Sequence, residues 1–366
     1  MTTPLRVLRF EGIHTDTLGH YLCGLGLLSA LSTQWPDVRG CWRDGRFVLV
    51  HATLTWESVA GFLLTEWQPT KYERWWKEAQ SSKDDAVLWL ARNRRSVGEV
   101  LLGDSHLVGT KQTRFNPVFG NAGVVGRRDF QKVWEECFSK ALSGRTKGTD
   151  VKAAAEEAPV RKKRPKAKTK TQLKIESWLQ SVLAASDAEL PTIGSTGTWF
   201  VFANKTSNSG QEWFRDGRLS PWAFLLAMEG AILLTGDVNR RLSSRARPYA
   251  VFPFVCDAAQ PSGSGQVGIS KAEFWAPIWS NPSTVVELRE LLERGVARLG
   301  VRSAHAPHEF AIAAMAAGTD SGVTAFARFD LRQTTSGEVF EAVPQEHVPV
   351  SQAGQDCDRH DASTLL

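Results

Sequence analysis

The sequence predicts a mixed α+β fold in which helices outnumber small sheets and a long disordered basic linker separates two lobes. Several segments repeat apolar residues at the three- and four-residue spacing of amphipathic helices, whereas shorter apolar runs between turn residues indicate strands. This periodicity is lost from residue 143 to 171, where Gly, Thr, Ala, Lys and Pro dominate. A chain of 366 residues with 42% hydrophobic residues is long enough for about two domains.

The predicted domain boundaries follow from that break. Residues 1–142 are expected to form an N-terminal α+β lobe and residues 172–350 a C-terminal α+β lobe. Between them, residues 143–171 form the basic linker, and residues 351–366 form a disordered tail.

The elements of the first lobe begin with a helix over residues 18–31. Its apolar positions recur at helical spacing: Leu18, Tyr21, Leu22, Leu25 and Leu28. A strand is predicted at residues 46–50, and further helices at residues 56–66, 84–95 and 130–142.

The elements of the second lobe begin with a helix at residues 173–185 and a strand at 198–203. Ser220-Pro221 is a typical helix start, so the apolar residues 222–234 behind it predict a buried helix. The remaining predicted elements are an edge strand at 249–255 containing Pro253, helices at 283–300 and 307–317, and a hairpin of 323–329 with 338–343.

Composition indicates a cytoplasmic protein. The sequence contains no apolar run of the ~18 residues that a membrane span requires, and its first residues lack the apolar core of a signal peptide. Five scattered cysteines without a CxxC spacing fit reduced thiols better than a disulfide framework or a structural zinc site. The 14 tryptophans favour core filling, and a surface that docks a partner is the alternative.

The positive charge of the chain is concentrated in one segment. Lys and Arg exceed Asp and Glu by five overall, yet residues 161–174 alone contain eight basic residues and no acidic one. Two interpretations stay open: a solvated linker, or an arm that follows a phosphate backbone. The candidate arm residues are Arg161, Lys162, Lys163, Arg164, Lys166, Lys168 and Lys170.

Two segments combine cations with glycine and asparagine, at residues 111–129 and 204–218. Glycines let the backbone approach a phosphate closely, arginine reads guanine edges or phosphates, and asparagine reads adenine edges. Ordinary polar surface loops are the other interpretation. The candidate DNA-binding residues are Lys111, Arg114, Asn116, Asn121, Arg127, Arg128, Asn204, Lys205, Asn208, Arg215 and Arg218.

The usual signatures of enzymes are missing from the sequence. It has no GxxxxGK[ST] loop, no GxGxxG behind a strand, no HExxH and no GxSxG elbow. We therefore predict no catalytic residue, metal or cofactor. An active site assembled from distant residues stays open, and a hydrolase or transferase of unrecognised fold using His106, Asp129 or Glu229 is the alternative function.

Four stretches of the sequence resemble the large-subunit family of subtype I-G (formerly I-U) CRISPR effector complexes, called Cascade. Residues 17–28 resemble its "PLxxYLKALGxLR" string, and residues 116–130 its Gly/Asn-rich "GRRDF" element. Residues 220–231 resemble its "NPWDFLLALEGAL" helix, and residues 274–279 with the stretch 309–329 resemble its C-terminal motifs. The matches follow the family's order and span about Gly12 to Pro349.

The resemblance implies a non-catalytic large subunit of a type I CRISPR surveillance complex. Such subunits contact the crRNA-containing backbone and the subunits at the crRNA end. They also recognise the protospacer-adjacent motif on target double-stranded DNA, which starts R-loop formation. A separate helicase-nuclease is recruited afterwards, and no membrane takes part.

Overall fold

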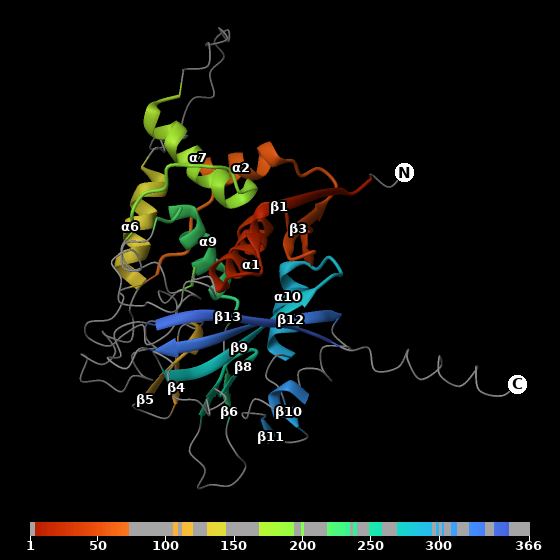
Figure 1. Ribbon diagram of the computed structural model, residues 1–366. Coiled ribbons are helices and arrows are strands. Elements are labelled where there is room, and N and C mark those ends of the chain that lie inside the picture. Colours follow the sequence, from red (N-terminus) through yellow and green to blue (C-terminus); the bar gives the residue numbers. More distant parts are fainter. Residues whose placement is uncertain are drawn as a thin grey trace, which may run out of the picture.

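The computed structural model describes residues 4–72, 105–108, 112–119, 130–143, 168–193, 199–200, 218–234, 237–239, 249–257, 269–294, 298–299, 302–303, 309–312, 322–333 and 340–350. Within them, helices combine with a three-stranded and a four-stranded antiparallel sheet (Figure 1). The mixed α+β class expected from the sequence is confirmed. None of the helices in these ranges is long and apolar enough to cross a membrane.

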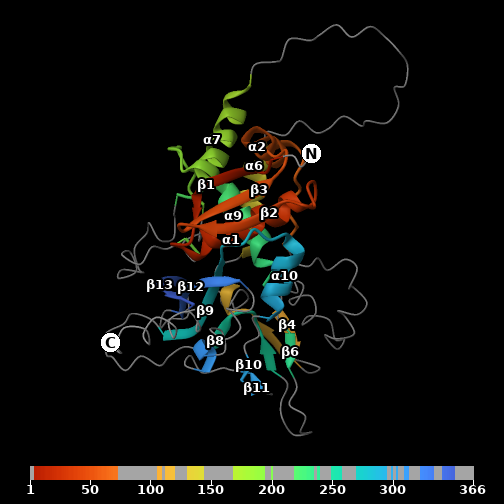
Figure 2. The ribbon, with the colours of Figure 1, turned by 90° about the vertical axis from the view of Figure 1, so that its right-hand side faces the viewer.

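The first sheet has the strand order β1–β3–β2, from β1 (Arg6–His14), β3 (Arg46–His51) and β2 (Arg39–Arg43) (Figure 2). β2 and β3 form a hairpin around Asp44 and Gly45, whose positive φ angles of 49° and 68° suit an Asp-Gly turn. One cross-strand row aligns Phe10, Phe47 and Trp42, all buried, on the face that packs against helices. The predicted strand at 46–50 is confirmed; β1 and β2 were not predicted.

Two helices buried on all sides form the centre of the molecule. They are α1 (Leu18–Ser32) and α9 (Pro221–Ala231), which pack on each other although about 200 residues separate them in the sequence. They cross at Gly26 and Gly230 because a side chain there has no room. A Cβ on Gly26 would lie 1.8 Å from the Leu226 carbonyl oxygen, and one on Gly230 would lie 2.0 Å from that of Leu22.

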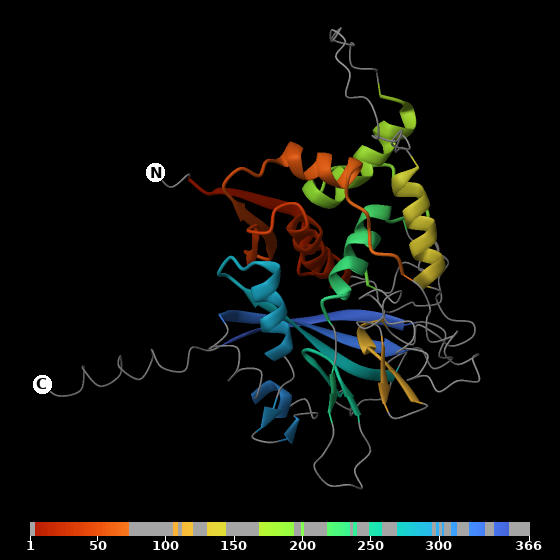
Figure 3. The same cartoon turned by 180° about the vertical axis from the view of Figure 1, so that it is seen from behind.

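Three further helices surround this pair: α2 (Trp56–Thr65), α6 (Phe130–Leu142) and α7 (Lys170–Ala184) (Figure 3). α6 and α7 both pack on α9, and α7 also packs on β1. All three were predicted. α7 begins at Lys170, so the last two residues assigned to the linker are helical.

The second sheet has the order β13–β12–β9–β8, from β13 (Phe340–Pro349), β12 (Val323–Gln333), β9 (Ile269–Trp279) and β8 (Val255–Asp257). The predicted hairpin is confirmed in β12 and β13, although both strands are longer than expected. β9 is central, yet it contains Pro277. Proline is tolerated because β8 pairs only with residues 272–274, which leaves one side of Pro277 free of the ladder.

The remaining elements are short. They are the ribbons β4 (Ser105–Val108) with β5 (Gln112–Phe115), β6 (Asp237–Asn239) with β7 (Tyr249–Val251) and β10 (Arg298–Leu299) with β11 (Arg302–Ser303), the 3₁₀ turn η1 (Pro117–Phe119) and α10 (Val285–Arg294).

Several predictions for the second half need correction. The helix predicted at 283–300 ends at Arg294, because the chain forms β10 from Arg298. The strand predicted at 198–203 is wrong where the structure describes it, since Trp199 and Phe200 form a turn. The single strand predicted at 249–255 is divided by residues 252–254 into β7 and β8. The helix predicted at 84–95 lies outside the described residues.

Both halves of the chain share one buried core. The Tyr21 hydroxyl of α1 donates to the Pro277 carbonyl of β9 at 3.1 Å, and the Trp279 indole donates to the Gly40 carbonyl of β2 at 2.8 Å. Seven described tryptophans are at most 5% exposed, as the core-filling interpretation expects: Trp42, Trp67, Trp134, Trp199, Trp222, Trp275 and Trp279. The break at 143–171 therefore interrupts the sequence without separating two cores.

Candidate nucleic-acid interface

The predicted nucleic-acid contacts lie partly inside and partly outside the described residues. The structure describes Arg114, Asn116, Lys168, Lys170 and Arg218. The others lie outside it: Lys111, Asn121, Arg127, Arg128, Asn204, Lys205, Asn208, Arg215, Arg161, Lys162, Lys163, Arg164 and Lys166. The described residues that flank the predicted loops establish where each loop segment joins the fold.

Four buried aromatic side chains, which we call the anchor cluster, join the two segments. Trp199 lies 5.6 Å from Phe119, 4.9 Å from Phe130 and 5.9 Å from Phe224, measured between ring centroids. Phe119 and Phe130 directly precede and follow residues 120–129, and Trp199 comes just before residues 201–217. The described residues on both sides of 120–129 and those just before 201–217 therefore lie at the same place in the fold.

Backbone contacts fix Trp199 within the anchor cluster. Its indole N–H donates to the Val118 carbonyl at 2.7 Å, and its own carbonyl accepts from the Gly19 N–H at 2.7 Å. The Phe200 ring covers Gly19 so closely that a Cβ there would lie 2.4 Å from the ring. Trp199 and Phe200, which precede the second segment, therefore pack on the first turn of α1.

After the second segment the described chain resumes at Arg218, between α7 and α9. Arg218 is exposed and forms a β-bridge with Thr192, and Leu219 donates its N–H to the Pro191 carbonyl at 3.3 Å. The Ser220 hydroxyl then donates to the Trp178 carbonyl of α7 at 2.7 Å. α9 starts one residue later and carries Phe224 into the anchor cluster.

Asn116 has a structural position that differs from the prediction. Its side chain is fully buried; the amide nitrogen donates to the Leu234 carbonyl at 3.2 Å and the amide oxygen accepts from the Val118 N–H at 3.1 Å. A buried asparagine bonded in this way fixes the turn at residues 117–119, and in this conformation it cannot reach a base edge. Arg114, in β5, is opposite His106 of β4.

The described end of the basic arm belongs to a helix. Thr169 caps α7 in a reciprocal pair with Gln172, and the Lys168 ammonium lies 2.6 Å from the Glu176 carboxylate. Lys174 is 3.4 Å from Glu189. Lys170 is exposed and forms no ion pair with any described residue. Two cations of the segment 161–174 therefore already have a carboxylate partner within the protein.

A histidine pair next to Phe200 and the first turn of α1 was not predicted from the sequence. The rings of His14, at the end of β1, and His20, in the first turn of α1, stack with centroids 4.1 Å apart. The Thr17 hydroxyl lies 2.7 Å from Nδ1 of His20, and the His20 ring contacts the edge of Phe200. The six-residue spacing of the two histidines matches no common motif.

The environment of the pair keeps both rings neutral near pH 7. Burial lowers the pKa of His20 well below its ordinary value, and His14 and Arg46 lower it further. Burial also lowers the pKa of His14; Asp16 opposes this shift and Arg46 adds to it. Protonation of either ring is therefore disfavoured in the folded protein.

We expect this pair to make the protein less stable at acid pH. As the pH falls below about 6.5, these histidines bind protons in the unfolded chain before they do in the folded protein. Protonation therefore favours the unfolded state, and the free energy of unfolding falls below that pH. Urea unfolding near pH 7.5 and pH 5.5 should show a smaller pH effect for the double variant His14→Gln/His20→Gln than for the wild type. The pH effects on the free energy of unfolding of the two proteins should differ by at most about 1.4 kcal/mol per histidine and pH unit. Equal pH effects in the two proteins would contradict the assignment.

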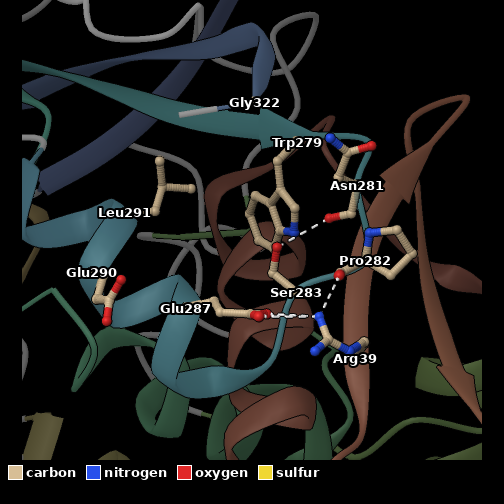
Figure 4. Close-up of a pocket in the computed structure, with 9 residues that line it drawn as sticks. All are labelled: Arg39, Trp279, Asn281, Pro282, Ser283, Glu287, Glu290, Leu291 and Gly322. Carbon is tan, nitrogen blue, oxygen red and sulfur yellow. Dashed lines mark hydrogen bonds and ion pairs between the residues drawn. The ribbon is translucent and has the colours of Figure 1, made fainter. Parts of the chain in front are cut away.

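A pocket of about 290 Å³ lies away from the anchor cluster, between β2, α10 and the end of β9 (Figure 4). Arg39 points toward Glu287 there, with 2.9 Å between guanidinium and carboxylate, and also donates to the Pro282 carbonyl. Glu287 caps α10 as well: the Thr284 N–H lowers the pKa of its carboxyl, and Arg39 lowers it further. The pair connects β2 to α10, and the pocket contains none of the predicted site residues.

Of the three residues proposed for the alternative enzymatic function, the structure describes the side chain of Glu229. The Glu229 carboxylate accepts from the Thr70 N–H at 3.1 Å and from its hydroxyl at 3.2 Å, which fastens the chain after α2 to α9. His106 lies in β4, and Asp129 lies outside the described residues. Within the described ranges, no group of three or more His, Cys, Asp or Glu residues could hold a metal ion.

Comparison of the chain with models of known protein families gives no match, and comparison with curated proteins gives none either.

Proposed function

We propose that this chain is the non-catalytic large subunit of a type I CRISPR surveillance complex. In this proposal it binds the crRNA-containing backbone and crRNA-end subunits and recognises the protospacer-adjacent motif on duplex DNA. R-loop formation then starts, and a separate helicase-nuclease is recruited. The proposal includes a cytoplasmic location and a helix-dominated architecture of two lobes that share one core.

The anchor cluster is the observation that supports the proposal most directly. Recognition of a short duplex motif requires base-reading groups and phosphate-binding groups at one location. Residues 120–129 and 201–217, which carry most of the predicted cations and amides, both adjoin Trp199 and its neighbours. Contacts from residues 120–129 and 201–217 can therefore act on the same stretch of duplex.

The stretches that carry the family resemblance also pack together. Besides the contacts of Gly26 with Gly230 and of Tyr21 with Pro277, the Cys23 thiol donates to the Ala223 carbonyl at 3.1 Å. The packing requires small residues at the helix crossing and particular partners around it. This gives a physical reason for the four stretches to occur in one chain.

The chemistry needed for this role is modest. Guide RNA pairing supplies most of the sequence specificity, so the protein has to recognise only a short motif and hold the DNA backbone. Arginine and asparagine in Gly-rich sequence suit that task.

Co-expression with the other subunits and a crRNA tests the proposal. We expect the chain to co-elute with a ribonucleoprotein that absorbs strongly at 260 nm, and the purified chain alone to leave nucleic acid unchanged. Elution as a free protein, or turnover of a substrate by the chain alone, would contradict the proposal and favour the hydrolase or transferase alternative.

A further inference from the structure

The two edges of the first sheet differ. The outer edge of β2 is closed by a bridge in which Gly40 and Ser283 exchange backbone hydrogen bonds of 2.8 and 2.9 Å. β1 forms the other edge, and along Arg6–Phe10 its outer side pairs with no residue in the described part of the chain. An unpaired strand edge presents a row of N–H and C=O groups that can bind another strand.

Apolar side chains at this edge are unusually exposed. Leu5 is 65% and Val7 52% exposed, and both belong to the small set of large hydrophobic residues with high exposure among those described. Because side chains alternate along a strand, Leu5 and Val7 share one face. Only the far end of β1 is covered, where Gly12 packs on the Val182 backbone of α7. The open part of β1 extends away from the helices (Figure 1).

We infer that this edge of β1 binds an extended segment of a neighbouring protein subunit, which adds a strand to the sheet. The inference rests on the proposed function, which requires such a neighbour. Main-chain hydrogen bonds to β1 would supply affinity, and side chains at alternate positions would supply specificity. One side chain of the segment covers Val7 and Leu5, and the next faces Arg6 and Leu8.

Charge at the edge defines the chemistry of the segment. Arg9 is neutralised by Glu11 at 2.8 Å and Asp44 at 3.1 Å, whereas Arg6 forms no ion pair with any described residue. A carboxylate on the added strand would pair with Arg6 across the ladder. A second copy of this chain would instead add another Arg6, and Glu11 of its β1 already pairs with Arg9, so Arg6 would gain no carboxylate. The segment is therefore an apolar strand with acidic residues from a different protein.

Two substitutions test the inference in the co-expressed, crRNA-containing assembly. Val7→Asp introduces a negative charge into the apolar contact, and Arg6→Glu reverses the unpaired cation. Each should weaken association of the chain with the rest of the assembly by about tenfold or more, equivalent to ~1.4 kcal/mol. Leu173→Asp is a matched control, because Leu173 is 53% exposed, about as much as Val7, but lies on α7. It should associate like the wild type.

Hydrogen exchange provides a second measurement on the wild-type chain. Amides of residues 5–10 should exchange more slowly in the assembly than in the free chain, as expected when an edge strand gains a partner. Suppose that the wild type assembles, that Val7→Asp and Arg6→Glu assemble equally well, and that residues 5–10 gain no protection. The inference is then wrong, while the proposed function survives. If the wild type does not assemble, the proposed function is wrong and the inference with it.

Discussion

Replacing Gly26 with alanine is expected to lower the free energy of unfolding by about 3 kcal/mol, the upper part of the range for overpacking a core. The added Cβ would lie 1.8 Å from the Leu226 carbonyl oxygen and 2.8 Å from the Gly230 nitrogen. Both are backbone atoms of a buried helix, so α1 and α9 must move apart. Urea unfolding monitored by circular dichroism measures the loss, and Gly230→Ala should behave similarly.

Gly61→Ala is the matched control for this prediction. Gly61 is also a helical glycine, in α2, but a Cβ there meets nothing within 4 Å. Alanine favours helix over glycine, so this variant should gain up to about 1 kcal/mol. If Gly26→Ala is as stable as Gly61→Ala, α1 and α9 do not cross as described.

Removing the cations of the basic arm is expected to weaken DNA binding mainly at low salt. Five basic residues of the arm precede Lys168: Arg161, Lys162, Lys163, Arg164 and Lys166. If each meets a duplex phosphate, replacing all five with alanine should flatten the slope of log K against log salt by about 4–5 units. Binding of the assembled complex to duplex DNA over a series of salt concentrations measures this slope.

The structure supplies a control for the arm. Lys168 and Lys174 pair with Glu176 and Glu189, so the double variant Lys168→Ala/Lys174→Ala should change the slope by less than about 1 unit. An unchanged slope after replacement of the five upstream residues would show that the arm is only a solvated linker.

Elements with strong local signals could be predicted from the sequence. α1, α6 and α9 begin within one residue of their predicted starts, because capping residues and apolar spacing are local properties. β1 was missed because Val7 and Leu8 are adjacent apolar residues between arginines, without the alternation of a half-buried strand. β9 was missed because Pro277 argues against a central strand, and the shortness of β8, which accommodates it, is visible only in the fold.

The candidate site could be predicted only in part. The sequence identifies the segments rich in cations and glycine, but their common origin depends on contacts between Phe119, Phe130 and Trp199 that are distant in sequence. Asn116 was predicted to read bases because it lies in the segment that combines cations with glycine and asparagine, and asparagine reads adenine edges. In the structure it is buried and its side-chain amide donates to the distant Leu234 carbonyl, a contact that no local pattern reveals.

Motif discrimination by the assembled complex tests the central claim most directly. Affinities for a duplex with the correct motif and for one with a scrambled motif, measured at one fixed salt concentration, give a ratio. Asn121→Ala or Arg128→Ala should reduce this ratio about fivefold or more, because a base contact contributes ~1–3 kcal/mol. The five-residue arm variant should lower both affinities and preserve the ratio, because phosphate contacts carry no sequence information. A wild-type complex that binds both duplexes equally, or a ratio that survives every single substitution in residues 111–128 and 204–218, would contradict recognition by these segments.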